Sequence, residues 1–259
     1  MTGAAGKTGR AVTASLQRRG VEVVPLVRGV VDLDTGVGLE HLRGCSAVYL
    51  IAPNVHPDEP GVVSRVLAAA KEHGVERVVY HSVAQPFAPA MPHHLDKARS
   101  EDLVRRSGLG WTVVQPCAYA QNLLDALRSE TPALTVPYSV DSPFSFVDLE
   151  DVGEAVAVAL TEPGHLGATY ELGGPDALSV RDVAALAQDV LGTGVPASSI
   201  SVKEWADGAG AALPDHARER LVAMFEYYDS YGLLTGSLVL QALLGRRPTC
   251  FAEVLRREL

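Results

Sequence analysis

The sequence predicts an α/β protein whose core is a parallel β-sheet. Apolar runs of strand length, rich in β-branched residues, alternate with helix-spaced segments over the first two thirds of the chain. The chain opens on three glycines at a spacing of three, followed by a helix-compatible run, as in a tight turn between a strand and a helix. With 259 residues, 47% of them hydrophobic, the chain can form one large α/β domain or a core domain with a small appendage.

The individual elements follow from hydrophobic periodicity and from turn residues. The first helix is expected over 10–19, ending at Gly20, and is followed by a β-branched strand over 21–27. The chain then leaves little room for a crossover helix before the next strand. Further strands are predicted at 47–52, 75–81, 111–114 and 168–172, and further helices at 59–73, 95–107 and 152–160. Ser179 and Asp182 form a capping box for a helix that ends at Gly192, and from Val202 onward the chain is expected to be helical and irregular.

Composition excludes several classes of partner. The formal net charge is −9 and no cluster of Lys or Arg is present, which argues against a nucleic-acid-binding surface. The three cysteines, Cys45, Cys117 and Cys250, are scattered, so neither a disulfide framework nor a metal site is predicted. No apolar run reaches the roughly 20 residues that span a bilayer, and no signal-type segment is recognised. We therefore expect a soluble, cytoplasmic protein with a small-molecule ligand.

The glycine turn predicts a phosphate-binding site. Gly3, Gly6 and Gly9 let the backbone approach a phosphate closely, and the following helix offers free N–H groups and its positive dipole end. Arg28 ends the next predicted strand, near the position at which NAD-binding units carry a carboxylate for the ribose 2′-hydroxyl. A guanidinium there pairs with a 2′-phosphate through a bond of roughly 1.5–3 kcal/mol, which favours NADP(H) about ten- to a hundredfold. The alternative is a solvated arginine at a strand end.

Other candidate functional residues lie at strand ends and in the late helices. Ser82 and Cys117 follow predicted strands, where the ligand crevice of a parallel sheet lies. His93 precedes Lys97 by four residues and so shares a helix face with it. The late aromatic cluster is expected to form either core or a lid and substrate wall; its residues are Met224, Phe225, Tyr227, Tyr228 and Tyr231.

These motifs, in this order, carry a family resemblance over nearly the whole chain. They are Gly3, Gly6 and Gly9, Arg28, the segments 92–97, 111–116 with Asn122, 146–148 with Asp151 and Val152, 170–175, and 244–248. Together they resemble the NmrA-like branch of the atypical short-chain dehydrogenases/reductases. The resemblance implies a Rossmann-like, doubly wound parallel sheet with a smaller, mostly helical C-terminal substrate or lid part. It divides the chain into 1–150, mainly the NADP(H)-binding core, and 151–259, mainly the C-terminal part, with 168–172 as a possible strand of the core sheet.

The resemblance also implies roles for individual residues. Gly3, Gly6, Lys7, Thr8 and Gly9 would surround the pyrophosphate, and Arg28 would face the adenosine phosphate. Asp32 and Leu33 resemble the pair on the adenine side, and Ala52 and Pro53 the strand end against the cofactor. Ser82 has the place of the catalytic serine and Lys97 that of the lysine bonded to the nicotinamide ribose. The nicotinamide-side loop would be Pro116, Cys117, Ala118 and Tyr119, and the substrate would contact Tyr119, Met224 and Tyr228.

Two departures from the wider superfamily matter. The usual motif is Tyr-x-x-x-Lys, whose tyrosine protonates the carbonyl, but here His93 stands at the tyrosine position. The proton donor could be His93, Ser82, or an acidic group of the substrate itself. A first strand should also precede Thr2, so we expect either a mis-assigned start or a sheet without its central strand, which would expose ladder groups on both neighbours.

The predicted function is that of an NADPH-dependent reductase of a bulky, mostly apolar carbonyl compound. A quinone-type or aromatic polyketide ketone of the angucyclinone type, reduced in antibiotic biosynthesis, is the specific expectation. The alternative is a catalytically silent NADP(H)-binding redox sensor, while a nucleotide-sugar epimerase is disfavoured because such enzymes keep the tyrosine. A monomer or a small homo-oligomer is expected, without nucleic acid or membrane as a partner.

Overall fold

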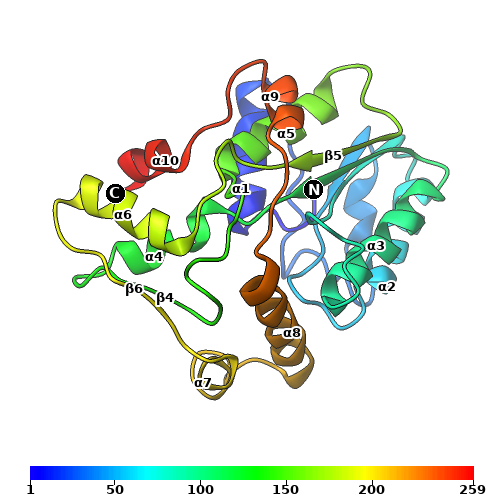
Figure 1. The fold of residues 1–259 in the computed structure, drawn as a ribbon. Coiled ribbons are helices and arrows are strands. Elements are labelled where there is room, and N and C mark those ends of the chain that lie inside the picture. Colours follow the sequence, from blue (N-terminus) through cyan, green and yellow to red (C-terminus); the bar gives the residue numbers. More distant parts are fainter. The chain divides into compact units, whose positions relative to one another are not determined.

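The computed structural model describes all residues, Met1–Leu259, and confirms the α/β class (Figure 1). The main sheet has the strand order β1-β2-β3-β5, with β1 at Ala47–Leu50, β2 at Arg77–His81, β3 at Gly110–Pro116 and β5 at Ala168–Leu172. β1, β2 and β3 are parallel, as predicted. Their carboxyl ends therefore lie at one edge of the sheet.

The chain forms two compact units, each built from separate segments. Unit 1 comprises Met1–Ala88, His93–Pro116 and Leu149–Glu171, and unit 2 comprises Pro89–Pro92, Cys117–Asp148 and Leu172–Leu259. The main sheet belongs to unit 1 except for Leu172, the last residue of β5, and β5 joins the sheet from the second half of the chain. None of the helices is long and apolar enough to cross a membrane.

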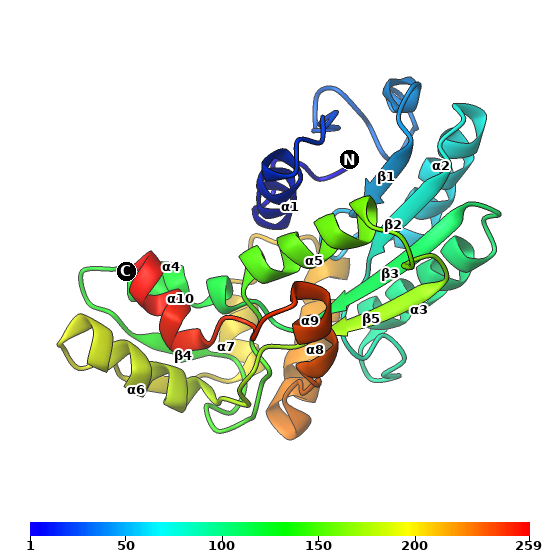
Figure 2. The ribbon, with the colours of Figure 1, turned by 90° about the horizontal axis from the view of Figure 1, so that it is seen from above.

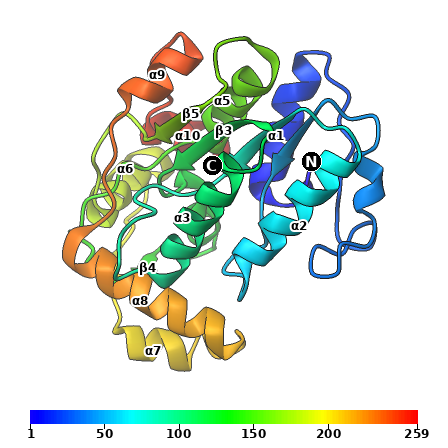
Figure 3. The same ribbon diagram turned by 90° about the vertical axis from the view of Figure 1, so that its right-hand side faces the viewer.

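In unit 1, helices cover both faces of the sheet. α1 (Lys7–Arg18) and α5 (Leu149–Thr161) pack together on one face, while α2 (Glu59–Glu72) and α3 (Pro92–Arg105) lie on the other (Figures 2 and 3). Apolar residues of the strands pack against apolar residues of α2 in the interior; the strands contribute Val48, Leu50, Val78 and Val113, and α2 contributes Val63 and Val66. The helices thereby hold the strand ends in place.

The strand predicted at 21–27 does not form. The segment forms no strand ladder, and its one bridge joins Leu26 to Thr2. The Leu26 amide donates to the Met1 carbonyl at 2.8 Å, and the Thr2 amide donates to the Tyr49 carbonyl at 3.1 Å. The prediction is wrong because a strand needs a partner along its length, and here only two residues lie beside the segment. Met1 and Thr2 are both buried and link it to β1.

The connection from this segment to β1 is short, as expected. It contains a single 3₁₀ helix, Leu39–Leu42, in place of a full crossover helix. A bridge between Arg28 and Val31 folds the chain back at its start. The loop from Arg28 to Asp34 consequently stays near the ends of the strands.

Unit 2 is mostly helical and carries a small parallel sheet that was not predicted. Its helices are the 3₁₀ helix Ala120–Asn122, α4 (Leu124–Leu127), α6 (Val180–Leu191), α7 (Val202–Asp207), α8 (Asp215–Tyr231), α9 (Leu238–Leu244) and α10 (Phe251–Glu258). β4 (Leu134–Val136) pairs with β6 (Ala197–Ser199), and three residues are too few to show a strand period. The capping box of Ser179 and Asp182 and the left-handed Gly192 at the end of α6 are confirmed.

The late aromatic cluster divides between core and surface. Tyr228 of α8 is 8% exposed and meets Tyr138 and Phe144 edge to face, with ring centroids 5.8 and 5.2 Å away. Burial raises the pKa of Tyr228 far above its usual value and that of Tyr138 to about 12. Tyr231, at the end of the same helix, is 68% exposed. The part of the cluster around Tyr228 therefore stabilises unit 2.

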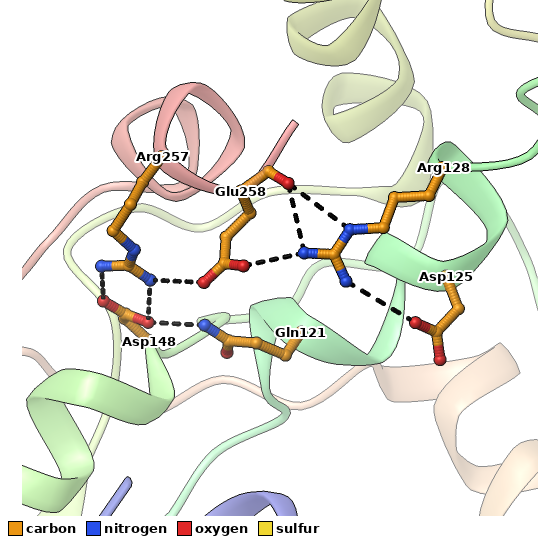
Figure 4. A network of polar contacts seen from close by, with 6 residues as sticks. All are labelled: Gln121, Asp125, Arg128, Asp148, Arg257 and Glu258. Carbon is orange, nitrogen blue, oxygen red and sulfur yellow. Dashed lines mark hydrogen bonds and ion pairs between the residues drawn. The ribbon is translucent and has the colours of Figure 1, made fainter. Parts of the chain in front are cut away.

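A buried carboxylate fixes the C-terminal helix within unit 2 (Figure 4). The side chain of Asp148 is fully buried and accepts two bonds from the guanidinium of Arg257, at 2.8 and 2.9 Å. Gln121 donates a third bond to it at 2.6 Å. Glu258 joins Arg257 to Arg128, which is half exposed. Asp148 thus anchors α10.

Candidate cofactor site

The glycine turn of unit 1 is tightly packed against the first helix. Gly3 has a left-handed φ of +65°, and its carbonyl accepts the Gly6 amide at 3.0 Å. A Cβ atom on Gly9 would lie 2.7 Å from Cα of Ala4 and closer still to the Gly3 carbonyl oxygen. Gly6 caps α1 without a side-chain bond, and Lys7 and Thr8 form the first turn. The turn therefore lies at the N-terminal end of a helix, the position that a phosphate site uses.

A cavity of about 880 Å³ opens beside this turn. It brings together many of the residues that were predicted to bind the cofactor: Gly3, Gly6, Arg28, Asp32, Leu33, Ala52 and Pro53. The remaining lining comes from Ala5, Leu26, Val27, Gly29, Val31, Asp34, Ile51 and His56. The cavity lies entirely within unit 1 and runs from the N-terminal end of α1 to the carboxyl end of β1.

Arg28 is the cation of this cavity that has no acidic partner. It is exposed and forms no ion pair, although two carboxylates share the cavity wall. Asp32 accepts the amide of Asp34 at 2.9 Å, and hydrogen bonds from the Thr35 side chain and then from Asp34 lower the pKa of this exposed carboxyl. Asp34 pairs with His56 and with Arg65. The Arg28 guanidinium is consequently available to an anionic ligand.

His56 is a cavity residue that sequence reasoning missed. Its Nε2 lies 2.9 Å from Asp34, and its Nδ1 accepts the amide of Asp58 at 3.0 Å, so a neutral ring carries its hydrogen on Nε2. The side chain is only 12% exposed. Its signal in the sequence was its place three residues after Pro53, in the loop that leaves β1.

Ser82 lies at the end of β2, as predicted, but its hydroxyl is engaged. The residue is buried, and Oγ donates to Oε1 of Glu101 at 2.5 Å. Glu101, fully buried on α3, also accepts Gln115 at 2.7 Å and Arg105 at 2.8 Å. The Ser82 proton is thus held by a carboxylate in the interior of unit 1.

Lys97 reaches the same edge of the sheet from α3. Its ammonium donates to the carbonyl of His81, the last residue of β2, at 3.2 Å and pairs with Glu59 at 2.8 Å. The Tyr80 hydroxyl donates to the same Glu59 oxygen at 2.6 Å. Burial, followed by the charge of Lys97, lowers the pKa of His81 to about 3, so this histidine is neutral. Neither Glu59 nor His81 was singled out from the sequence.

His93 lies in the first turn of α3, which begins three residues earlier than predicted. It is half-buried and shares a helix face with Lys97. Its ring meets the ring of His94 edge to face, with 4.6 Å between the ring centroids. Burial lowers the pKa of His94 to about 4. His93 is thus the more accessible of the two rings.

The predicted nicotinamide loop and substrate residues belong largely to unit 2. Pro116 ends β3 in unit 1, whereas Cys117 is buried in unit 2 and its thiol donates to the Leu233 carbonyl at 3.2 Å. Tyr119 forms a bridge with Val147, and Met224 is half-buried on α8. The cofactor and substrate roles of these residues stay predictions.

Comparison with known proteins decides the family. The model of the NmrA-like family matches residues 13–245, most of the chain. The chain belongs to the NmrA-like family. The resemblance predicted from its motifs is thereby confirmed.

Relatives with described activities include two that are 31% identical to this chain. One is an NAD(P)H azoreductase of Xenophilus azovorans, matched over 72% of this chain but only 65% of its own length. The other is a (4-alkanoyl-5-oxo-2,5-dihydrofuran-3-yl)methyl phosphate reductase of Streptomyces griseus, matched over 74% of this chain and 73% of its own.

Solved structures share the whole fold at lower identity. The NADPH-dependent quinone oxidoreductase QOR2 of Escherichia coli, complexed with NADPH, superposes with a TM-score of 0.84 at 23% identity and covers 99% of this chain and 98% of its own. The Citrobacter triphenylmethane reductase complexed with NADP(H) gives 0.84 at 21% identity, over 100% of this chain and 99% of its own. These likenesses establish a common fold.

Proposed function

We propose that this NmrA-like protein is an NADPH-dependent reductase of a bulky, mostly apolar and conjugated carbonyl compound. The observation that carries the proposal is the cavity that joins the glycine turn to Arg28, a guanidinium without an acidic partner. Relatives named as an azoreductase, a dihydrofuranyl-methyl phosphate reductase and a quinone oxidoreductase support a reductase. Within this class we favour quinone-type and aromatic polyketide ketones, such as those reduced in antibiotic biosynthesis.

The residues of unit 1 fit NADP(H). The N-terminal end of α1, beside the turn at Gly3 and Gly6, would offer N–H donors to a pyrophosphate, and Arg28 would offer a cation to the 2′-phosphate. Asp32 and Leu33 would lie on the adenine side, and Lys97 would bond the nicotinamide ribose. The bound cofactor would supply a hydride to the carbonyl carbon, with NADP⁺ and an alcohol as products.

The carbonyl oxygen needs a proton as the hydride arrives. Ser82 is a poor source because its hydroxyl already donates to Glu101. His93, half-buried and one turn from Lys97, is one donor that we propose, and an acidic hydroxyl on the substrate is the other. A His93→Gln variant separates them, since substrate-assisted reduction would keep most of its turnover.

The proposal is tested by binding first and by turnover second. Nicotinamide fluorescence should show tighter binding of NADPH than of NADH, by about ten- to a hundredfold. Loss of absorbance at the nicotinamide band is then followed with a panel of quinones, polycyclic aromatic ketones and azo dyes. Oxidation of NADPH by a quinone or ketone supports the proposal, and tight binding without oxidation by any of the panel contradicts it.

The second candidate is a sensor that binds NADP(H) without chemistry. The engaged hydroxyl of Ser82, together with the absence of the usual tyrosine, favours this alternative. A sensor would bind NADP⁺ and NADPH with different affinities, or change its affinity for a protein partner, and would show no turnover. Equal affinities for the two forms and no coupling to a partner would rule it out.

A further inference from the structure

Lys97 is held by a carboxylate that comes from another helix. Glu59 is the first residue of α2, where the helix dipole favours a negative charge, and its side chain is 4% exposed. One of its oxygens accepts both the Lys97 ammonium at 2.8 Å and the Tyr80 hydroxyl at 2.6 Å. The Lys97 side chain is 14% exposed, so the ion pair is largely removed from water. A buried carboxylate and a buried ammonium each need the other.

The ion pair lies at the edge of the sheet that carries the cavity. Leu50 of β1 is in register with Tyr80 of β2, which places Ile51 level with His81. Ile51 lines the cavity, and the His81 carbonyl accepts a bond from Lys97. The ammonium is therefore one strand away from the cavity wall. Glu59 and the His81 carbonyl use two of its three N–H donors, which leaves the third for a ligand.

We propose that Glu59 is a positioning residue that fixes the Lys97 ammonium for the nicotinamide ribose of the cofactor, an inference that rests on the proposed NADP(H)-binding function. A lysine side chain has four rotatable bonds, and fixing it when the ligand arrives would weaken binding. Glu59 and the His81 carbonyl fix it beforehand, so the ligand meets a preorganised donor. The adenosine half of the cofactor does not depend on this pair, because its cavity is lined by other residues.

A double-mutant cycle with two ligands tests the proposal. The variants are Glu59→Gln, Lys97→Met and the double variant, and the ligands are NADPH and adenosine 2′,5′-bisphosphate, which lacks the nicotinamide half. Each single variant should weaken NADPH binding about tenfold, as expected for one charge-assisted bond, and change bisphosphate binding less than about twofold. Because Glu59 acts through Lys97, the double variant should bind NADPH as Lys97→Met does.

Three outcomes would overturn the proposal. Losses that multiply in the double variant would mean that Glu59 acts independently of Lys97. Equal weakening of both ligands would mean that Glu59 only supports the fold of unit 1. A Tyr80→Phe control removes the hydroxyl that bonds Glu59 but keeps the ion pair with Lys97. If Tyr80→Phe weakens NADPH binding as much as Glu59→Gln does, Glu59 has a structural role instead. If the unaltered protein binds neither ligand, the proposed function itself fails, which is a different result.

Discussion

Replacing Gly9 by alanine should destabilise the protein itself, before any ligand is bound. The added Cβ would lie 2.7 Å from Cα of Ala4 and still closer to the Gly3 carbonyl, both of them backbone atoms that no side-chain rotation can move. α1 has little room to move, because it packs closely against α5. The Ala11 carbonyl oxygen of α1 is so near Gly153 of α5 that a Cβ added to Gly153 would lie 2.7 Å from it. A shift of α1 would therefore disturb a second close contact. We expect a loss of about 3 kcal/mol, the upper end of the range for overpacked sites.

The matched control is Gly6→Ala in the same turn. A Cβ on Gly6 would meet only the Gly3 carbonyl oxygen, at 3.4 Å, and the φ of Gly6 is −72°, which alanine adopts readily. Replacing the N-cap glycine by alanine should lower the free energy of unfolding by about 0.5–1 kcal/mol. Because Gly6 lines the cavity, the same methyl group should weaken NADPH binding. Urea unfolding of the apo proteins and NADPH titration separate the effects; equal unfolding midpoints for Gly9→Ala and the unaltered protein would refute the packing argument.

Three further predictions concern the cation of the cavity, the anchor of α10 and buried histidines. Arg28→Ala should weaken NADPH binding about ten- to a hundredfold and leave NADH binding unchanged, measured by fluorescence titration. Arg257→Ala leaves the buried Asp148 carboxylate without its guanidinium and should lower the free energy of unfolding in urea by about 3–5 kcal/mol. Burial lowers the pKa values of His81 and His94 to about 3 and about 4 in the folded protein, below the usual 6.5. Their contribution to the free energy of unfolding is therefore complete above pH 6.5 and is lost as the pH falls toward the lowered values. Unfolding followed between pH 6 and pH 4.5 should show stability falling by up to about 2.7 kcal/mol per pH unit from these two groups.

Each of these predictions has its own control. NADH affinity that falls together with NADPH affinity in Arg28→Ala would place the arginine away from the 2′-phosphate. Arg128→Ala removes a half-exposed arginine from the network of Figure 4 and should cost less than about 1 kcal/mol; a cost equal to that of Arg257→Ala would show that burial of Asp148 is not the cause. His94→Gln should reduce the pH slope by about 1.4 kcal/mol per unit, and an unchanged slope would mean that His94 titrates normally in the fold.

Local sequence signals are enough to predict the α/β class, most of the elements of unit 1 and the outline of the phosphate turn. These features depend on local signals: β-branched runs, helical periodicity, glycines at fixed spacing and a capping box at Ser179. The motifs also led to the resemblance to the NmrA-like family, whose model matches residues 13–245. The strand predicted over 21–27 does not form, since its composition is that of a strand but only Met1 and Thr2 lie beside it.

The pairing of buried polar groups follows from the folded chain and not from local sequence patterns. Glu59 and Lys97 are 38 positions apart, and nothing local marks Glu59 as more than the first residue of a helix. The same holds for the bond from Ser82 to Glu101 and for the place of His56 in the cavity wall. Strand register and helix packing set these pairings, and a buried charge must find its partner wherever the fold brings one. Local residue patterns therefore indicate where a cofactor would bind. The residues that hold the binding side chains in place, such as Glu59 beside Lys97, are brought there by long-range packing that no short motif encodes.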